Sequence, residues 1–380
     1  MKKNIKLKKF EPLFFLIVFF IIFGALSSKM GLPNMLNTLM NTSYQLLIET
    51  VFYIMGISVL SGALGKLLEE FGIVGVLEKI LRPLMKPLWN LPGVAALGGV
   101  LTFLSDNPAI ITLAKDKSFS KYFKKYQLIS ITNFGTSFGM GLIVLVFMAG
   151  RGYSGPALIG LAAAFMGSII STRLAQKLIL RAKPEFIEDA VPQKETMDEE
   201  IKMEMDAAEE GLLLRVLNSL LDGGKSGVEL GLAIIPGVIT ISTFVMMFTF
   251  GPGENGYTGA AYEGIGLLPA LAEKRGFIFE WLFGFQHAEL VAFPMTAMGA
   301  VGAALGLVPT FQESGLLDGN AIAVFTAMGM CWSGYLSTDT AMLDSLGYRE
   351  LTPKTILAHT IGGLCAGIIA HWLFVVINLI

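Results

Sequence analysis

The chain has 380 residues, of which 53% are hydrophobic and only 15% charged, and its formal net charge is −2. Soluble domains carry about 25% charged residues, so this composition argues against an ordinary soluble fold. No segment interleaves basic and aromatic residues as nucleic-acid-binding modules do, so we expect no nucleic-acid partner. Long apolar runs recur at roughly the 20 residues that a helix needs to cross a bilayer, without the alternation of barrel strands. We therefore predict an all-α polytopic membrane protein.

The N-terminal segment is the first predicted span. Residues 10–26 are almost wholly apolar, and the residues before them include Lys2, Lys3, Lys6, Lys8 and Lys9. The run is long enough to span, and no A-x-A-like cleavage site of a signal peptide follows it. Because lysine-rich flanks stay on the cytoplasmic side, we expect residues 1–30 to form a transmembrane helix of the cell (inner) membrane with a cytoplasmic N-terminus.

Residues 43–183 are predicted to form a first membrane repeat. A short polar loop at 31–41 precedes it, and its expected spans are 44–64, 128–149 and 156–180. Residues 67–90 mix charged residues with Ile, Val and Leu and are interrupted by Pro83 and Pro87. We expect an interfacial amphipathic helix in that stretch rather than a span.

Residues 93–114 of this half are apolar except for a polar interruption. Two short apolar pieces flank Ser105, Asp106, Asn107 and Pro108, which predicts a discontinuous helix or a re-entrant hairpin. Such backbone is tolerated at membrane depth only where protein or a water-filled cavity satisfies it. A carboxylate there costs at least ~2.5 kcal/mol, so we expect Ser105, Asp106 and Asn107 to face a solute or a coupling ion. The alternative is a surface turn that caps the next helix.

A strongly acidic stretch divides the two halves. Residues 184–210 contain eleven acidic residues against Lys194 and Lys202, so we predict a solvated cytoplasmic linker. Residues 211–380 are predicted to form the second membrane repeat, with an amphipathic segment and two spans at 212–221, 228–250 and 355–380. The glycine-rich stretch 251–266 carries no lysine or arginine, so we place it on the outer side.

The second half also contains polar residues inside an apolar stretch. Gln286 and Glu289 lie between the two apolar pieces of 277–307. We expect Gln286 and Glu289 to contact the solute, with Glu289 binding its hydroxyl groups or the coupling proton. An interfacial polar cluster at a helix end explains the same pattern equally well.

A further polar interruption follows the apolar residues 321–336. Ser337, Thr338 and Asp339 are predicted to form a second helix break that contacts the solute, and Asp339 is also a candidate for ion coupling. The alternative is again a helix N-cap, for which Thr338 or Asp339 is well suited.

The two halves resemble each other weakly. We align residues 104–110 with 336–342, and Glu49 with Glu229, because each is a single carboxylate near the start of its half. If the N-terminus is cytoplasmic, the first repeat starts outside and the second inside, so the repeats are inverted. Inverted repeats with broken helices indicate a secondary transporter. Glu49 and Glu229 are weaker ion-coupling candidates, since the dipole at a helix start explains them as well.

Several kinds of site have no support in the sequence. The three histidines, His287, His359 and His371, do not form a metal-ligand spacing, and Cys331 and Cys365 form no disulfide framework. A proton-relay role for a histidine stays open, although packed polar residues explain them more simply. No Walker A, GxSxG or HExxH motif occurs, so we expect neither an enzyme nor a bound metal or cofactor.

Two motifs carry a resemblance to a known family. The chain resembles the nucleoside-recognition, or gate-domain, superfamily of membrane proteins, which includes spore maturation proteins and, more distantly, concentrative nucleoside transporters. Residues 104–108 are similar to the Q-T-E-A-P-like element of those transporters in placing a carboxylate two residues before a proline. Residues 288–293 look like their N-E-F-V-A-Y element, with the carboxylate at Glu289, and a later polar break corresponds loosely to 337–339.

The same motifs depart from the family pattern. Leu104, Ser105 and Asp106 stand where the family has Gln, Thr and Glu, and Ala288 replaces an Asn. The family's contacts to nucleobase and ribose are therefore not preserved as a set. The resemblance implies a transporter but does not identify a nucleoside as its solute.

We predict a secondary transporter that moves a small polar solute, such as a nucleoside-like molecule, by alternating access coupled to Na⁺ or H⁺. Its expected partners are the solute and the lipid bilayer, and the sequence leaves homo-oligomerisation open. One alternative is a non-transporting membrane scaffold or signalling protein of the gate-domain type, with the acidic linker as its docking segment. A channel is the other alternative.

Overall fold

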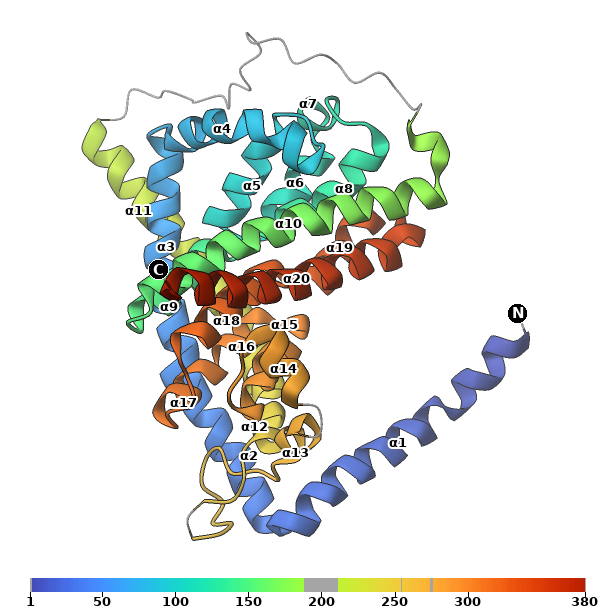
Figure 1. Ribbon diagram of the computed structural model, residues 1–380, viewed down its shortest axis with the longest axis vertical. Helices are drawn as coiled ribbons and strands as arrows, with labels where there is room; N and C mark the ends of the chain where they lie inside the picture. Colours follow the sequence, from blue (N-terminus) through green and yellow to red (C-terminus); the bar gives the residue numbers. More distant parts are fainter. Residues whose placement is uncertain (1, 188–210, 254, 274–275, 380) are drawn as a thin grey trace.

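The computed structural model describes residues 2–187, 211–253, 255–273 and 276–379 (Figure 1). Apart from an isolated bridge between Gly253 and Gly256, these residues form helices and loops. The predicted all-α fold is therefore confirmed. Most of the acidic linker predicted at 184–210 lies outside the described residues, which in that region end after a short 3₁₀ turn, Pro184–Ile187.

After the long helix α1, the first half consists of two further long helical stretches with shorter helices between them. A π-helical segment, Leu46–Val51, joins α2 to α3 without a break. The helices are α1 (Lys2–Met30), α2 (Leu32–Gln45), α3 (Phe52–Glu70), α4 (Ile73–Leu84), α5 (Ala95–Leu104), α6 (Pro108–Lys115), α7 (Lys117–Ser120), α8 (Lys125–Thr136), α9 (Gly141–Gly150) and α10 (Ser154–Ala182).

The second half has the same general order. It begins with a long stretch in which a π-helical segment, Val238–Ser242, joins α11 to α12. The helices are α11 (Leu212–Gly237), α12 (Thr243–Thr249), α13 (Leu267–Glu273), α14 (Gly276–Phe283), α15 (Ala292–Gly299), α16 (Val301–Leu305), α17 (Leu307–Glu313), α18 (Gly319–Cys331), α19 (Tyr335–Ser345) and α20 (Thr352–Leu379), with a 3₁₀ turn, Ala288–Val291, before α15.

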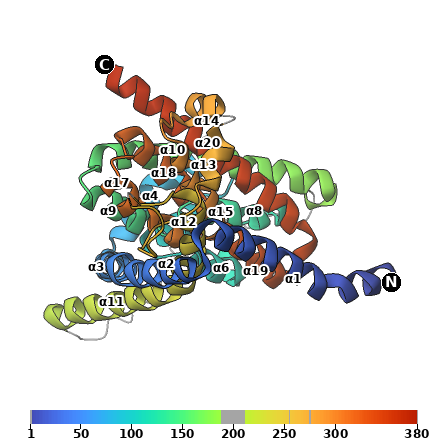
Figure 2. The ribbon, with the colours of Figure 1, turned by 90° about the horizontal axis from the view of Figure 1, so that it is seen from below.

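Six stretches of the described chain are long and apolar enough to cross a membrane. Each contains one predicted span, so the multi-pass architecture is confirmed. The stretches are Phe10–Met30, Leu32–Glu70, Lys125–Gly150, Ser154–Ala182, Leu212–Thr249 and Arg349–Leu379. The first of them, within α1, extends away from the rest of the molecule in both views (Figures 1 and 2).

One sequence prediction about helix limits is wrong. Residues 31–41 are not a loop: Gly31, at φ +77°, makes the turn, and α2 follows with a proline in its first turn, where a missing N–H is tolerated. The polar residues that suggested a loop instead donate to backbone carbonyls, Asn34 to Tyr257 and Asn41 to Gly259, both at 2.8 Å. The predicted amphipathic segment 212–221 is the first part of the continuous helix α11.

The two halves are joined by two pairs of long helices. Helix α3 packs along α11, and α10 packs along α20 (Figures 1 and 2). Glycines allow α3 and α11 to approach closely. A Cβ on Gly62 would lie 2.3 Å from the carbonyl oxygen of Gly223, and one on Gly227 would lie 2.4 Å from the backbone of Ser58. Small residues at such crossings allow backbones of membrane helices to touch. Each half thus contributes its first and last long helix to the contact with the other half.

The order of elements corrects the alignment of the halves. In each half a long helix is followed by short helices around a polar break, then by a broken helix, then by a long helix. This order is consistent with inverted repeats. It pairs the break at 105–107 with the one at 284–287, and the break between α8 and α9 with that between α18 and α19. The alignment of 104–110 with 336–342 is therefore wrong.

The loop 250–266, between α12 and α13, is organised by Glu263. This carboxylate, 4% exposed, accepts hydrogen bonds from the N–H groups of Thr258 and Gly259 and from the Thr258 hydroxyl, at 2.6–3.0 Å. Thr38 of α2 donates a longer one at 3.4 Å. Burial raises the pKa of Glu263, but the bonds from Thr258 and Gly259 outweigh it and hold the pKa below its usual 4.5. The ionised carboxylate therefore stabilises the folded loop.

We expect Glu263→Gln to lower the thermal unfolding midpoint in detergent at pH 7. Hydrogen bonds to a charged group contribute about 1.5–3 kcal/mol, and glutamine keeps one neutral acceptor oxygen. Because the folded pKa is depressed, the contribution is complete above the unfolded pKa of about 4.3 and disappears as the pH falls through the folded pKa. The gap between parent and variant should therefore narrow on acidification. Glu350→Gln, at an exposed carboxylate, is the control, and equal midpoints at pH 7 would contradict the assignment.

Candidate functional site

The predicted break at Ser105–Pro108 is present between α5 and α6. The Ser105 hydroxyl donates to the carbonyl of Leu101 at 2.7 Å, and Pro108 opens α6. Asn107 occupies the N-cap position, but its side chain makes no capping bond. Its Nδ2 instead donates to the backbone carbonyl of Ser333 at 2.5 Å. Asn107 therefore ties the break to the other half of the protein, which the surface-turn alternative does not explain.

A second break, absent from our predictions, separates α8 from α9. The span predicted at 128–149 is interrupted at residues 137–140, where Met140 adopts a left-handed conformation with φ +54°. The glycines around this segment, Gly135, Gly139 and Gly141, were the available signal. Glycines are equally typical of close helix packing, so they do not by themselves predict a break.

The third break lies just before the one predicted at 337–340. Helix α18 ends at Cys331 and α19 begins at Tyr335, with Gly334 at φ +59° between them. Residues 337–340 are helical, so both their predicted break and the N-cap alternative are wrong. The hydroxyls of Ser337 and Thr340 donate to carbonyls of the preceding turn, Gly334 at 2.9 Å and Leu336 at 2.7 Å, so these polar side chains are satisfied within the helix.

The three breaks meet at Asn107. A Cβ on Gly139 would lie 2.1 Å from its Oδ1, and one on Gly334 would lie 3.2 Å from its Nδ2. The amide is therefore held between the α8–α9 break and the α18–α19 break, and only a glycine at 139 leaves it room. This arrangement brings loosened backbone from both halves to one point inside the protein.

Two cavities open beside this point. The first, which we call the break cavity, has a volume of about 390 Å³ and is lined by Asp106, Asn107, Ser333, Ser337 and Thr338 and by residues 299–303. The second, the α3–α11 cavity, measures about 470 Å³. Asp106 lines both, so its carboxylate lies where the two cavities adjoin.

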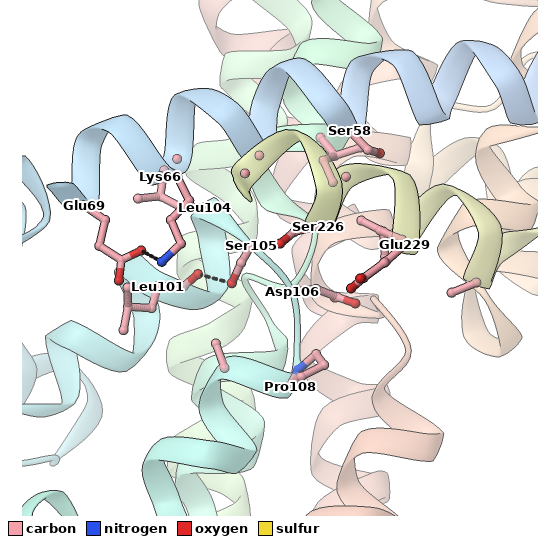
Figure 3. A pocket seen from close by; sticks show the side chains of 18 residues that line it. Ser58, Lys66, Glu69, Leu101, Leu104, Ser105, Asp106, Pro108, Ser226 and Glu229 are labelled. Atoms are coloured by element: carbon pink, nitrogen blue, oxygen red, sulfur yellow. Dashed lines mark hydrogen bonds and ion pairs between the residues drawn. The ribbon is translucent and has the colours of Figure 1, made fainter. Parts of the chain in front are cut away.

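A pair of carboxylates lies in the α3–α11 cavity. Figure 3 shows the side chains of Asp106 and Glu229 pointing toward each other, one from the break and the other from α11. The Oδ1 atom of Asp106 is buried without a hydrogen-bond partner. At the edge of the same cavity, Lys66 and Glu69 form an ion pair at 2.8 Å (Figure 3). The cavity thus holds two acidic groups that no ion pair within the described residues neutralises.

The helix-dipole explanation for Glu49 and Glu229 fails. Glu229 lies far inside α11, and Glu49 lies in the π-helical segment of the continuous α2–α3 stretch. Neither carboxylate is near a helix start, where the dipole would favour it. Glu49 is exposed and lines neither the break cavity nor the α3–α11 cavity, so the structure brings only Glu229 to Asp106.

Gln286 and Glu289 lie in a different place. They line a separate cavity of about 410 Å³, together with His287 and Glu280. The helical structure is interrupted between the two apolar pieces of 277–307, after α14 and before the 3₁₀ turn that contains Glu289. Their contact with the solute stays a prediction.

Asp339 is also apart from the cavities. It is fully buried, accepts a hydrogen bond from the Thr132 hydroxyl at 3.1 Å, and lies 3.6 Å from Nδ1 of His359. Within the described part of the chain, no cluster of three or more His, Cys, Asp or Glu side chains could hold a metal ion. The candidate site therefore consists of the two adjoining cavities around Asp106.

Comparison with known proteins agrees with this architecture. Residues 12–152 match the family model named Gate, described as nucleoside recognition, which confirms the resemblance seen in the sequence. No curated protein sequence matches the chain.

The fold is similar to that of CNTnw, a concentrative nucleoside transporter. Its inward-facing substrate-bound structure has a TM-score of 0.51 at 12% identity, covering 87% of this chain and 80% of that one. A doubly substituted form in an outward-facing state has a TM-score of 0.52 at 11% identity, covering 88% and 80%. At these identities the similarity shows the shared fold.

Proposed function

We propose that this chain, whose residues 12–152 match the gate family, is an ion-coupled secondary transporter that moves a small polar solute by alternating access. The main support is Asp106, which presents a buried, unpartnered oxygen where two cavities adjoin at three helix breaks. Discontinuous helices at a repeat interface are typical of transporter sites. The fold shared with outward- and inward-facing CNTnw structures also supports the proposal.

The solute would bind in the break cavity. Its polar lining combines the Asp106 carboxylate and the Asn107 amide with the hydroxyls of Ser337 and Thr338, and Ser105 lies at its edge in the adjoining α3–α11 cavity. Such a set accepts hydrogen bonds from hydroxyl and N–H groups, and the volume of about 390 Å³ suits a molecule of nucleoside size or smaller. The proposed solute class is therefore a small, uncharged or cationic molecule with several donors, nucleosides included.

The coupling cation would bind between Asp106 and Glu229. Two carboxylates facing each other across a cavity repel, and either a proton or Na⁺ between them removes that cost. Because Asp106 also lines the break cavity, the same carboxylate can respond to the cation and to the solute. This shared residue gives the two binding events a physical link.

Residues 43–183 and 211–380 would act as the two inverted repeats that move relative to each other. The acidic residues 184–210 connect them, and the lysine-rich N-terminus would lie on the cytoplasmic side of the cell membrane. The cavities lie between elements of both repeats, so a relative movement changes which side they face.

Uptake into proteoliposomes tests the proposal. A panel of labelled nucleosides, nucleobases, polyols, amino sugars and amino acids is offered under Na⁺ and proton gradients, with protein-free vesicles alongside. In a Cys365→Ala background, Ser337→Cys should be protected from a small thiol reagent by the transported solute. Ser345→Cys, on the same helix outside the cavity, should not be. If no solute moves and none protects Ser337→Cys, the transport function is refuted.

A further inference from the structure

A second acidic site lies behind the break cavity, in the interior between α8, α19 and α20. Asp339 and His359 are both 0% exposed, and their Oδ1 and Nδ1 atoms are 3.6 Å apart. The Thr132 hydroxyl donates to the same oxygen at 3.1 Å, while Oδ2 of Asp339 has no partner. The pair is too far apart for a good hydrogen bond but close enough to exchange a proton after a small movement.

The groups around the pair are almost all neutral. Thr132 and Ser137 face it from α8 and the residue after its end, with the Ser137 hydroxyl 3.4 Å from Nε2 of His359. The titratable neighbours are Tyr335 of α19, whose ring lies 4.9 Å from the His359 ring, and Cys331 of α18, whose thiol donates to the carbonyl of Ala164. No lysine or arginine among the described residues forms an ion pair with Asp339, so His359 is the group able to balance the carboxylate.

We propose that Asp339 and His359 together bind one proton, and that this proton is a coupled ion of the transporter in addition to the cation between Asp106 and Glu229. The inference rests on the proposed function and adds a second ion site to it. A buried carboxylate without a cation or a proton is costly. One proton satisfies the pair whether it rests on the histidine, giving an ion pair, or on the carboxyl group, giving two neutral partners. Loss of that proton leaves one uncompensated negative charge in the interior.

The location of the pair links it to the solute. Asp339 follows Thr338, which lines the break cavity, and both lie in the first turns of α19 after the α18–α19 break. Ser137, which contacts His359, belongs to the α8–α9 break. Movement of either break on solute binding therefore changes the distance within the pair or its access to water. The proton is held in the closed interior and exchanges only when the breaks rearrange.

The first experiment separates proton coupling from transport itself. Counterflow of the transported solute, which needs no gradient, and accumulation driven by a pH gradient are measured in proteoliposomes. The parent is compared with Asp339→Asn, with His359→Gln and with both changes together, which leaves a neutral pair. We expect the double variant to keep counterflow and to accumulate less solute than the parent under the pH gradient. His371→Gln, on the same helix with its partner Asn320, is the matched control and should keep both. Undiminished pH-driven accumulation in the double variant overturns the proposal.

A second experiment decides the proton site even if no solute is transported. Above about pH 6.5 an Asp and a His in the unfolded chain are both deprotonated. The folded pair is proposed to hold one proton under the same conditions. The unfolding equilibrium of the parent, measured by SDS titration in mixed micelles, should then shift toward unfolding as the pH rises, by up to about tenfold per pH unit relative to the double variant. If the unfolding equilibrium changes equally with pH in the parent and the double variant, the proposal is overturned. If the two proteins differ in this pH dependence but the parent shows no counterflow, only the transport function is refuted.

Discussion

Asp106→Asn is expected to reduce solute uptake by about tenfold or more. A hydrogen bond to a charged group contributes about 1.5–3 kcal/mol, and each 1.4 kcal/mol corresponds to a factor of about ten. Because Asp106 lines both cavities, the substitution removes a charge from the proposed solute site and from the proposed cation site together. Uptake of the transported solute and its dependence on the ion gradient are the measurements.

Two companion variants make this result specific. Glu229→Gln removes a carboxylate that lines only the α3–α11 cavity, so it should weaken the ion dependence while affecting solute affinity less. Asp222→Asn removes an exposed charge from the same helix, outside both cavities, and should behave as the parent. Full uptake by Asp106→Asn, with unchanged response to the gradient, is the outcome that refutes the role of this residue.

Gly62→Val is expected to prevent normal folding of the membrane region. A Cβ at this position overlaps the carbonyl oxygen of Gly223, which belongs to the backbone and cannot turn aside. Overpacking of a core by side chains commonly costs about 1–3 kcal/mol, and a clash with backbone forces α3 and α11 apart. The variant should give less monodisperse protein in detergent and a clearly lower unfolding midpoint than the parent.

The same helix provides the control for this prediction. Gly56 also lies on α3, but a Cβ added there would meet nothing within 4 Å, so Gly56→Val makes the same chemical change in open space. It should leave the unfolding midpoint close to that of the parent. Equal loss of stability in both variants would mean that valine in this helix, rather than the crossing, is responsible.

Much of the fold was predictable because its signals are local. The six spans follow from runs of apolar residues, and the break at Ser105–Pro108 follows from a carboxylate and a proline inside such a run. The break between α8 and α9 has neither a charge nor a proline, and Met140 takes its left-handed conformation in tertiary context. Conversely, Ser337–Thr340 looked like a break but is part of α19, where the hydroxyls of Ser337 and Thr340 donate to carbonyls of the preceding turn.

The site was predictable as a set of candidates but not as an arrangement. Asp106, Glu229 and Asp339 all stood out as carboxylates in apolar surroundings, yet no local pattern tells which of them meet. Asp106 faces Glu229 because the end of α5 packs against α3 at Gly65, beside α11, and Asp339 faces His359 because α19 packs on α20. These partners are set by packing over long sequence separations, which local patterns in one chain do not specify.

The glycine contact between α3 and α11 also bears on how the halves can move. Where backbone meets backbone at Gly62, Gly223 and Gly227, no side chain of one helix is inserted between side chains of the other. Further along the same crossing, the Met55 side chain occupies the space beside Gly231, and Arg215 of α11 forms an ion pair with Glu70 of α3 at 2.7 Å. Relative movement of the two halves at this crossing therefore requires the Met55 side chain to change position and this ion pair to break.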